Sequence, residues 1–96
     1  MRKTFKLSHD RIKPERWVEA IKHEIKKYIK RERRRELPEG VDYLDFDCRF
    51  GKDMESSETI HLSEINEHIN WAVDEQLDSF YVEVMGKPGI RKKHVD

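Results

Sequence analysis

The chain has 96 residues, of which 35% are hydrophobic and 42% charged, and its formal net charge is zero. This length fits one small domain, and regularly spaced apolar residues exclude a disordered chain. The single cysteine excludes an internal disulfide, and no apolar run approaches the ~20 residues of a membrane-spanning helix. The basic start MRKTFKLSHD lacks the apolar stretch of a signal peptide, so we expect a cytoplasmic protein.

The zero net charge hides a strong segregation of charge along the chain. Residues 1–36 carry 14 basic and 6 acidic side chains, a net of +8. Residues 42–83 carry 2 basic and 12 acidic side chains, a net of −10, and residues 84–96 have a net of +3. Such segregation can steer a charged partner, or it can be neutralised inside the fold.

In the first part of the chain, apolar and polar residues alternate, and the apolar residues then adopt a helical spacing. In KTFKLS, Phe5 and Leu7 lie on one side, which is the pattern of a half-buried strand. From Pro14 to about Glu36 the apolar residues follow a helical period, which predicts an amphipathic helix. Its apolar stripe consists of Trp17, Val18, Ile21, Ile25, Tyr28 and Ile29. Pro38 and Gly40 are expected to end this helix.

The middle of the chain predicts two further strands. VDYLDFDCRFG alternates again, and its inward residues are Leu44, Phe46, Cys48 and Phe50. KDMESSE is a polar loop. TIHL, residues 59–62, is a short strand candidate with Ile60 and Leu62 inward.

The last part of the chain predicts a helix and a final strand. Ser63 is the expected N-cap of the helix, whose buried stripe consists of Ile65, Ile69, Ala72, Val73 and Leu77. SFYVEVM is the final strand, with Phe80, Val82 and Val84 inward. We therefore expect a single domain over residues 1–86 and a flexible basic tail over residues 87–96.

The predicted elements follow the order β-α-β-β-α-β. Each strand supplies about three inward residues, which is enough for one covered face only. An α+β sandwich satisfies this pattern, with two helices on one face of an antiparallel sheet in the ferredoxin-like arrangement. If residues 59–62 are not a strand, the alternative is a three-stranded sheet with two helices.

Two long segments of the chain carry a family resemblance. VEAIKHEIKKYIKRERRRELPEGVDYLDFDCRFG, followed later by LDSFYVEVMGKPG, resembles a family of small bacterial proteins known only as a domain of unknown function. The resemblance covers nearly the whole chain and implies a bacterial origin and a compact single domain. It implies no catalytic residue, cofactor or partner.

The end of the first helix is the first candidate binding surface, because seven of the ten residues 26–35 are basic. The candidate residues are Lys27, Lys30, Arg31, Arg33, Arg34 and Arg35. Glu32 falls inside the apolar sector, so we expect the buried part of the helix to end at Ile29 and the arginines to project into solvent. Protruding guanidinium groups bind phosphate or carboxylate well. The alternative is an ordinary solvated face, or one that pairs with the acidic second helix.

Trp71 marks the second candidate surface, with Glu67 and Glu75 around it. It lies nearly opposite the buried stripe of its helix, among acidic residues. Tryptophan is enriched at binding hot spots, so this surface would suit a basic partner, such as a second copy of this chain. The alternative is that Trp71 covers the edge of the core.

The sequence offers little support for a metal site or for catalysis. The histidines are scattered without zinc-like spacing, and Cys48 points inward as a small hydrophobic residue. There is no glycine-rich phosphate loop, so we predict no catalytic residue, no metal and no cofactor.

The two candidate surfaces predict a non-catalytic protein-binding module with an unknown protein partner. Nucleic-acid binding through the basic helix is the alternative. The chain is neutral overall, however, and an open sheet face with Asp45, Asp47 and Glu83 between Tyr43 and Tyr81 would repel phosphate. No membrane partner is expected, and the sequence leaves the oligomeric state open.

Overall fold

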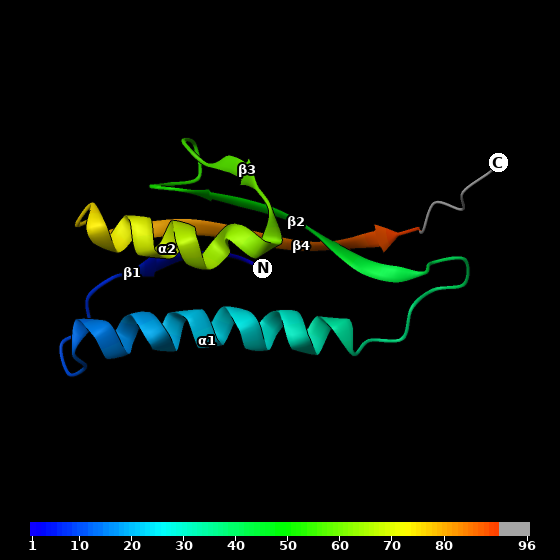
Figure 1. Ribbon diagram of the computed structural model, residues 1–96, viewed down its shortest axis with the longest axis horizontal. Helices are drawn as coiled ribbons and strands as arrows, with labels where there is room; N and C mark the ends of the chain where they lie inside the picture. Colours follow the sequence, from blue (N-terminus) through cyan, green and yellow to red (C-terminus); the bar gives the residue numbers. More distant parts are fainter. Residues whose placement is uncertain (91–96) are drawn as a thin grey trace.

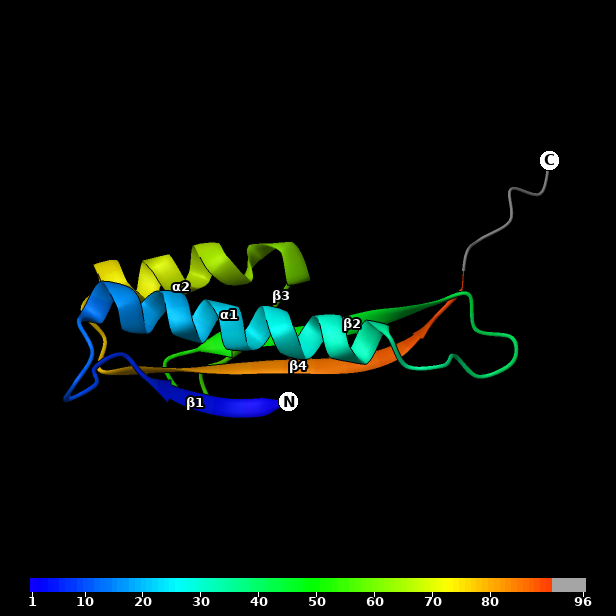
Figure 2. The ribbon, with the colours of Figure 1, turned by 90° about the horizontal axis from the view of Figure 1, so that it is seen from below.

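Two helices lie on one face of a four-stranded antiparallel sheet in the structure, a computed structural model that describes residues 1–90 (Figure 1). The strands are β1 (Arg2–Lys6), β2 (Tyr43–Gly51), β3 (Glu58–Ile60) and β4 (Ser79–Gly89). The helices are α1 (Pro14–Arg33), the short 3-10 helix η1 (Leu62–Glu64) and α2 (Ile65–Asp74). Figure 2 shows α1 and α2 on the same side of the sheet.

The strand order is β1-β4-β2-β3, and all neighbouring strands are antiparallel. The α+β class, the sequence of elements and the four strands are confirmed, whereas the ferredoxin-like strand order is not. The three-stranded alternative is wrong, because Glu58–Ile60 pairs with Cys48–Phe50 as a fourth strand.

The outer halves of β2 and β4 form a two-stranded extension, here called the β2–β4 arm. It consists of residues 43–47 paired with residues 85–89. β1 pairs only with residues 79–83, and β3 pairs only with residues 48–50, so neither reaches the arm. In Figure 1 the arm extends beyond β1 and β3, and in Figure 2 the C-terminal half of α1 runs along it.

The core lies between the helices and the sheet face that they cover. Val18, Ile21 and Ile25 of α1 and Ile65, Ile69 and Ala72 of α2 are buried against the inward strand residues, as their periods predict. Phe80 is central, because its ring lies 5.5 Å from that of Phe5 and 5.0 Å from that of Phe50. Each buried aromatic or aliphatic side chain stabilises the fold by about 1.5–3 kcal/mol.

The predicted ends of several elements need correction. The first helix ends at Arg33 rather than near Glu36. β4 continues to Gly89, because residues 87–89 pair with residues 43–45, so the predicted domain boundary at residue 86 is too early. Residues 91–96 of the predicted tail, which include the cations Arg91, Lys92 and Lys93, lie outside the described residues.

The start of the second helical segment also differs from the prediction. His61 caps η1, since its side chain accepts from the Ser63 amide at 3.3 Å while the Glu64 side chain accepts from the His61 amide at 3.1 Å. The predicted N-cap, Ser63, lies inside η1. Leu62 likewise belongs to η1 rather than to a strand.

The predicted stripe of α2 is too wide at its C-terminal end. Val73 is 40% exposed, and α2 ends one residue later, at Asp74. Gln76 then adopts a left-handed φ of 55°, which turns the chain so that Leu77 packs against the core.

The prediction that α1 outruns the hydrophobic body is wrong for its inner face. The Glu32 side chain is only 14% exposed, and Arg33 lies over the Phe46 ring, with its guanidinium carbon 5.7 Å from the ring centroid. The cause is the length of β4, which carries the sheet along beneath the end of the helix. In the basic segment, residues 26–35, only the faces of the helix that point away from the sheet are therefore exposed to solvent.

Candidate functional site

A cleft of about 780 Å³ separates α1 from the segment that runs from η1 into α2. Its floor is apolar: Ile25 and Ile29 line it from α1, and Leu62 and Ile65 line it from the other side. Its α1 wall holds five cations and one carboxylate, namely Lys22, Lys26, Lys30, Arg33, Arg34 and Glu19. The cleft is therefore a positively charged trough with a hydrophobic base.

Three of these cations form a single row on α1. Lys26, Lys30 and Arg34 are spaced four residues apart, which places them on one face of the helix about one turn from each other. Within residues 1–90 their side chains have no hydrogen bond, ion pair or ring contact. Like charges at this spacing repel by about 0.2–0.5 kcal/mol per pair, so the row carries positive charge that the described fold does not neutralise.

The predicted basic patch also includes a second row, which faces away from the cleft. Lys27, Arg31 and Arg35 have the same spacing but different surroundings. The Arg31 guanidinium carbon lies 5.6 Å from the centroid of the Tyr28 ring, and Arg35 is 3.3 Å from the Glu32 carboxylate. The structure thus divides the six predicted residues between two surfaces, with Lys30, Arg33 and Arg34 at the cleft.

One polar contact crosses the seam between the helices. Lys22 Nζ donates a hydrogen bond of 2.6 Å to Asn70 Oδ1, and it lies 3.6 Å from Glu19. Among the described residues no ion pair joins α1 to α2, and Glu24 instead pairs with Lys3 at 2.9 Å. The acidic second helix therefore does not neutralise the basic helix in the way that the alternative required.

A second cavity, of about 580 Å³, lies at the opposite edge of α2, between that helix, β3 and the end of β2. Its aromatic and apolar lining consists of Phe50, Ile60, His68 and Trp71, and its charged lining of Lys52, Glu58 and Glu67. Trp71 is 43% exposed, so it borders this cavity without being enclosed. The structure brings Trp71 and Glu67 together here, whereas Glu75 does not line the cavity and caps the end of α2.

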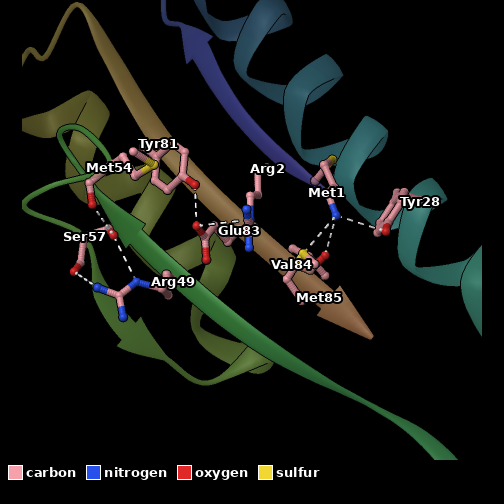
Figure 3. Close-up of polar contacts among 10 residues, drawn as sticks. All are labelled: Met1, Arg2, Tyr28, Arg49, Met54, Ser57, Tyr81, Glu83, Val84 and Met85. Atoms are coloured by element: carbon pink, nitrogen blue, oxygen red, sulfur yellow. Dashed lines mark hydrogen bonds and ion pairs between the residues drawn. The ribbon is translucent and has the colours of Figure 1, made fainter. Parts of the chain in front are cut away.

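On the sheet face opposite the helices, several side chains contact one another instead of pointing freely into solvent (Figure 3). Tyr81 points to this face but is only 5% exposed, and Met54 lies beside it. The Tyr81 hydroxyl donates to the Glu83 carboxylate, and this contact raises the pKa of Tyr81. Arg2 lies 3.6 Å from Glu83. The expected open row between Tyr43 and Tyr81 is therefore wrong for Tyr81, which is unavailable for stacking on a base.

The arm carries the remaining predicted carboxylates of this face. Lys87 Nζ donates a hydrogen bond of 2.6 Å to Asp47, and this contact raises the pKa of Lys87. Asp45 accepts a hydrogen bond of 2.8 Å from the Phe46 amide. Both carboxylates are thus held by neighbours on the sheet, and neither lines the cleft.

A family model described as a family of unknown function (DUF6172) matches residues 1–95. The chain belongs to this family. The match confirms the resemblance to a domain of unknown function, while a bacterial origin stays a prediction. Comparisons with curated proteins and with solved structures found no match.

Residues 1–90 of this member of the DUF6172 family lack two kinds of feature. No group of three or more His, Cys, Asp and Glu residues in this range is arranged to hold a metal ion. No helix in the same range is long and apolar enough to cross a membrane. Cys48 is 1% exposed, and burial, followed by the charges of Asp47 and Asp45, raises the pKa of its thiol to about 11.

Sequence reasoning missed several residues of the cleft in this DUF6172 chain. Lys26 belongs to the unpaired row, and its spacing from Lys30 was the available signal. Leu62 lines the floor from the other side, and Ser63 and Asn66 line the opposite wall. Nothing in the sequence indicates that these residues face α1. Their position depends on the distance between α1 and α2, which pack on the same face of the sheet.

Proposed function

We propose that this protein is a non-catalytic protein-binding module of the cytoplasm, and that its cleft binds an acidic segment of a partner protein. The observation that carries the proposal is the row formed by Lys26, Lys30 and Arg34, which has no side-chain partner within residues 1–90 and borders an apolar floor. Carboxylates on a partner would supply the missing counter-charge.

The apolar floor favours a protein segment over a nucleic acid. A helix or extended peptide with alternating acidic and apolar residues could place its apolar side chains on Ile29 and Leu62 while its carboxylates meet the row. Nucleic acid would use the cations but would leave this apolar surface without a complement. The polar side chains of Ser63 and Asn66 on the opposite wall could accept hydrogen bonds from either ligand or donate them to it.

Nucleic-acid binding is the second candidate, and the same row is the observation that favours it. Cations one helical turn apart can contact successive phosphates. Against this, the chain has no net charge. We therefore place it behind the acidic protein segment.

Two synthetic peptides of equal charge and a short DNA duplex test the proposal by titration calorimetry. The first peptide has leucine at every third or fourth position and glutamate between, and the second has serine in place of leucine. We expect the leucine peptide to bind at least about tenfold more tightly than the serine peptide, because only the first can cover the apolar floor. Stronger binding of the duplex than of both peptides would support the second candidate instead.

The two rows of α1 provide matched variants for this experiment. The cleft variant is Lys26→Ala, Lys30→Ala and Arg34→Ala, and the control is Lys27→Ala, Arg31→Ala and Arg35→Ala. Both remove three positive charges from one helix at the same spacing. We expect the cleft variant to lose binding by about tenfold or more while the control changes by less than about threefold. Equal losses in both variants would contradict a cleft-specific site.

A further inference from the structure

We infer that the cavity beside Trp71 is a second binding site, and that it takes an arginine side chain from a basic segment of a partner protein. The inference extends the proposed binding function to a surface of opposite charge and does not depend on occupation of the cleft. It is carried by the aromatic wall, the carboxylates and the apolar base of this cavity.

The aromatic wall fits the guanidinium group. Trp71 is 43% exposed in a fold whose other tryptophan, Trp17, is partly buried and donates a hydrogen bond of 2.7 Å to the Lys6 carbonyl. The Trp71 indole has no hydrogen bond or ring contact within residues 1–90. A planar guanidinium group stacks on an indole face, and tryptophan gives the strongest such contacts.

The carboxylates complete the recognition of a cation. Glu67 precedes Trp71 by four residues, so both side chains lie on one face of α2, and Glu58 lines the same cavity from β3. Neither carboxylate has an ion-pair partner among the described residues. An arginine stacked on Trp71 could donate to one of them through its fork of N–H groups.

The base of the cavity accounts for the rest of the ligand. Phe50 and Ile60 provide apolar surface for the methylene stem of an arginine. The Phe50 ring lies 5.3 Å from that of His68, so the base is held in place by the core. Lys52 at the rim opposes a cationic ligand, and its removal is therefore expected to strengthen binding.

A blocked Gly-Arg-Gly peptide tests the inference, with the citrulline peptide as its matched control. Citrulline keeps the shape of arginine and removes its charge. The readout is the indole N–H resonance of Trp71 in a nitrogen-labelled protein, with that of Trp17 as an internal reference, assigned from Trp17→Phe and Trp71→Phe variants. We expect the arginine peptide to shift the Trp71 signal saturably and the citrulline peptide to bind about tenfold more weakly or not at all.

Four variants connect this result to the cavity. Trp71→Ala lacks the reporter indole, so its binding is followed by titration calorimetry and is expected to be abolished. Glu67→Gln is expected to weaken binding severalfold and Lys52→Ala to strengthen it, whereas Glu75→Gln, outside the cavity, leaves it unchanged. Equal binding of arginine and citrulline peptides, undiminished binding to Trp71→Ala, or no saturable shift would overturn the inference. Failure of the leucine peptide at the cleft would not affect this result, so the two ideas fail separately.

Discussion

Arg49 on β2 donates two hydrogen bonds to Ser57 at the end of the loop over residues 52–57. Its Nε donates to the Ser57 hydroxyl at 3.1 Å, and a terminal nitrogen donates to the Ser57 carbonyl (Figure 3). Ser57 is 5% exposed and donates from its hydroxyl to the Met54 carbonyl at 2.7 Å. An arginine that the sequence places on an exposed sheet face therefore fixes the loop that borders the Trp71 cavity.

Replacing Arg49 with alanine should destabilise the fold by about 1–3 kcal/mol. The reason is that the buried Ser57 carbonyl and hydroxyl lose charge-assisted donors. Urea denaturation followed by circular dichroism measures the change. Lys52→Ala in the same loop removes an exposed cation and serves as a control, with an expected effect below about 0.5 kcal/mol. Equal urea midpoints for the two variants would show that the Arg49 contacts contribute nothing.

Gly51→Ala should be more damaging than Gly89→Ala, although both positions are crowded. A Cβ atom at Gly51 would lie 2.6 Å from the Ser57 Cα and 2.8 Å from the Ser57 amide nitrogen. A backbone segment must shift to relieve this overlap, so we expect a loss of about 2–3 kcal/mol.

A Cβ atom at Gly89 would instead meet the Tyr43 ring at 2.4 Å. Tyr43 is an exposed side chain that can rotate away, so we expect a loss of about 1 kcal/mol or less. Thermal unfolding of both variants checks the difference. A larger loss for Gly89→Ala would mean that the Tyr43 ring is held as firmly as the loop.

Cys48 should make the stability of the fold depend on pH in the alkaline range. Burial raises the pKa of the thiol from 9.0 to about 11, so the folded state keeps a proton that the unfolded state releases. The resulting stability is fully present below pH 9 and is lost as the pH rises through 11. Its size is about 2–3 kcal/mol.

Unfolding free energies of the wild type and Cys48→Ala measure this contribution. We expect the wild type to lose more stability than the variant between pH 9 and pH 11, since the variant has no thiol to titrate. Parallel pH profiles for the two proteins would contradict the raised pKa. The thiolate fraction at neutral pH is also expected to be about 100-fold below that of a free cysteine, which slows alkylation of the native protein.

Glu32→Ala should destabilise the protein by about 1 kcal/mol. The side chain is 14% exposed and lies 3.3 Å from Arg35, so alanine removes an ion pair that is partly shielded from water. Glu36→Ala removes an exposed carboxylate beyond the end of α1 and should change stability by less than about 0.5 kcal/mol. If the two variants melt at the same temperature, Glu32 is no more than a surface residue.

The sequence by itself determined the order of the elements and most of the face that each one buries. The alternation of Leu44, Phe46, Cys48 and Phe50 and the helical spacing of Val18, Ile21 and Ile25 indicate the covered side, because only one register buries them together. The exposure of Trp71 also follows from its position opposite Ile69 on the helix. These features depend on residues close together in the chain, so the spacing of the apolar residues is enough to predict them.

Only the tertiary structure decided which charges are free. Residues 87–89 contain glycine and proline and suggest a tail, yet they extend β4 because residues 43–45 lie beside them. That extension places sheet beneath the end of α1, leaves the Glu32 side chain only 14% exposed and brings Arg33 over Phe46. Lys26, Lys30 and Arg34 are left facing a cleft whose other wall comes from residues more than 25 positions away. The partners of a side chain depend on distances between elements, which no local pattern encodes.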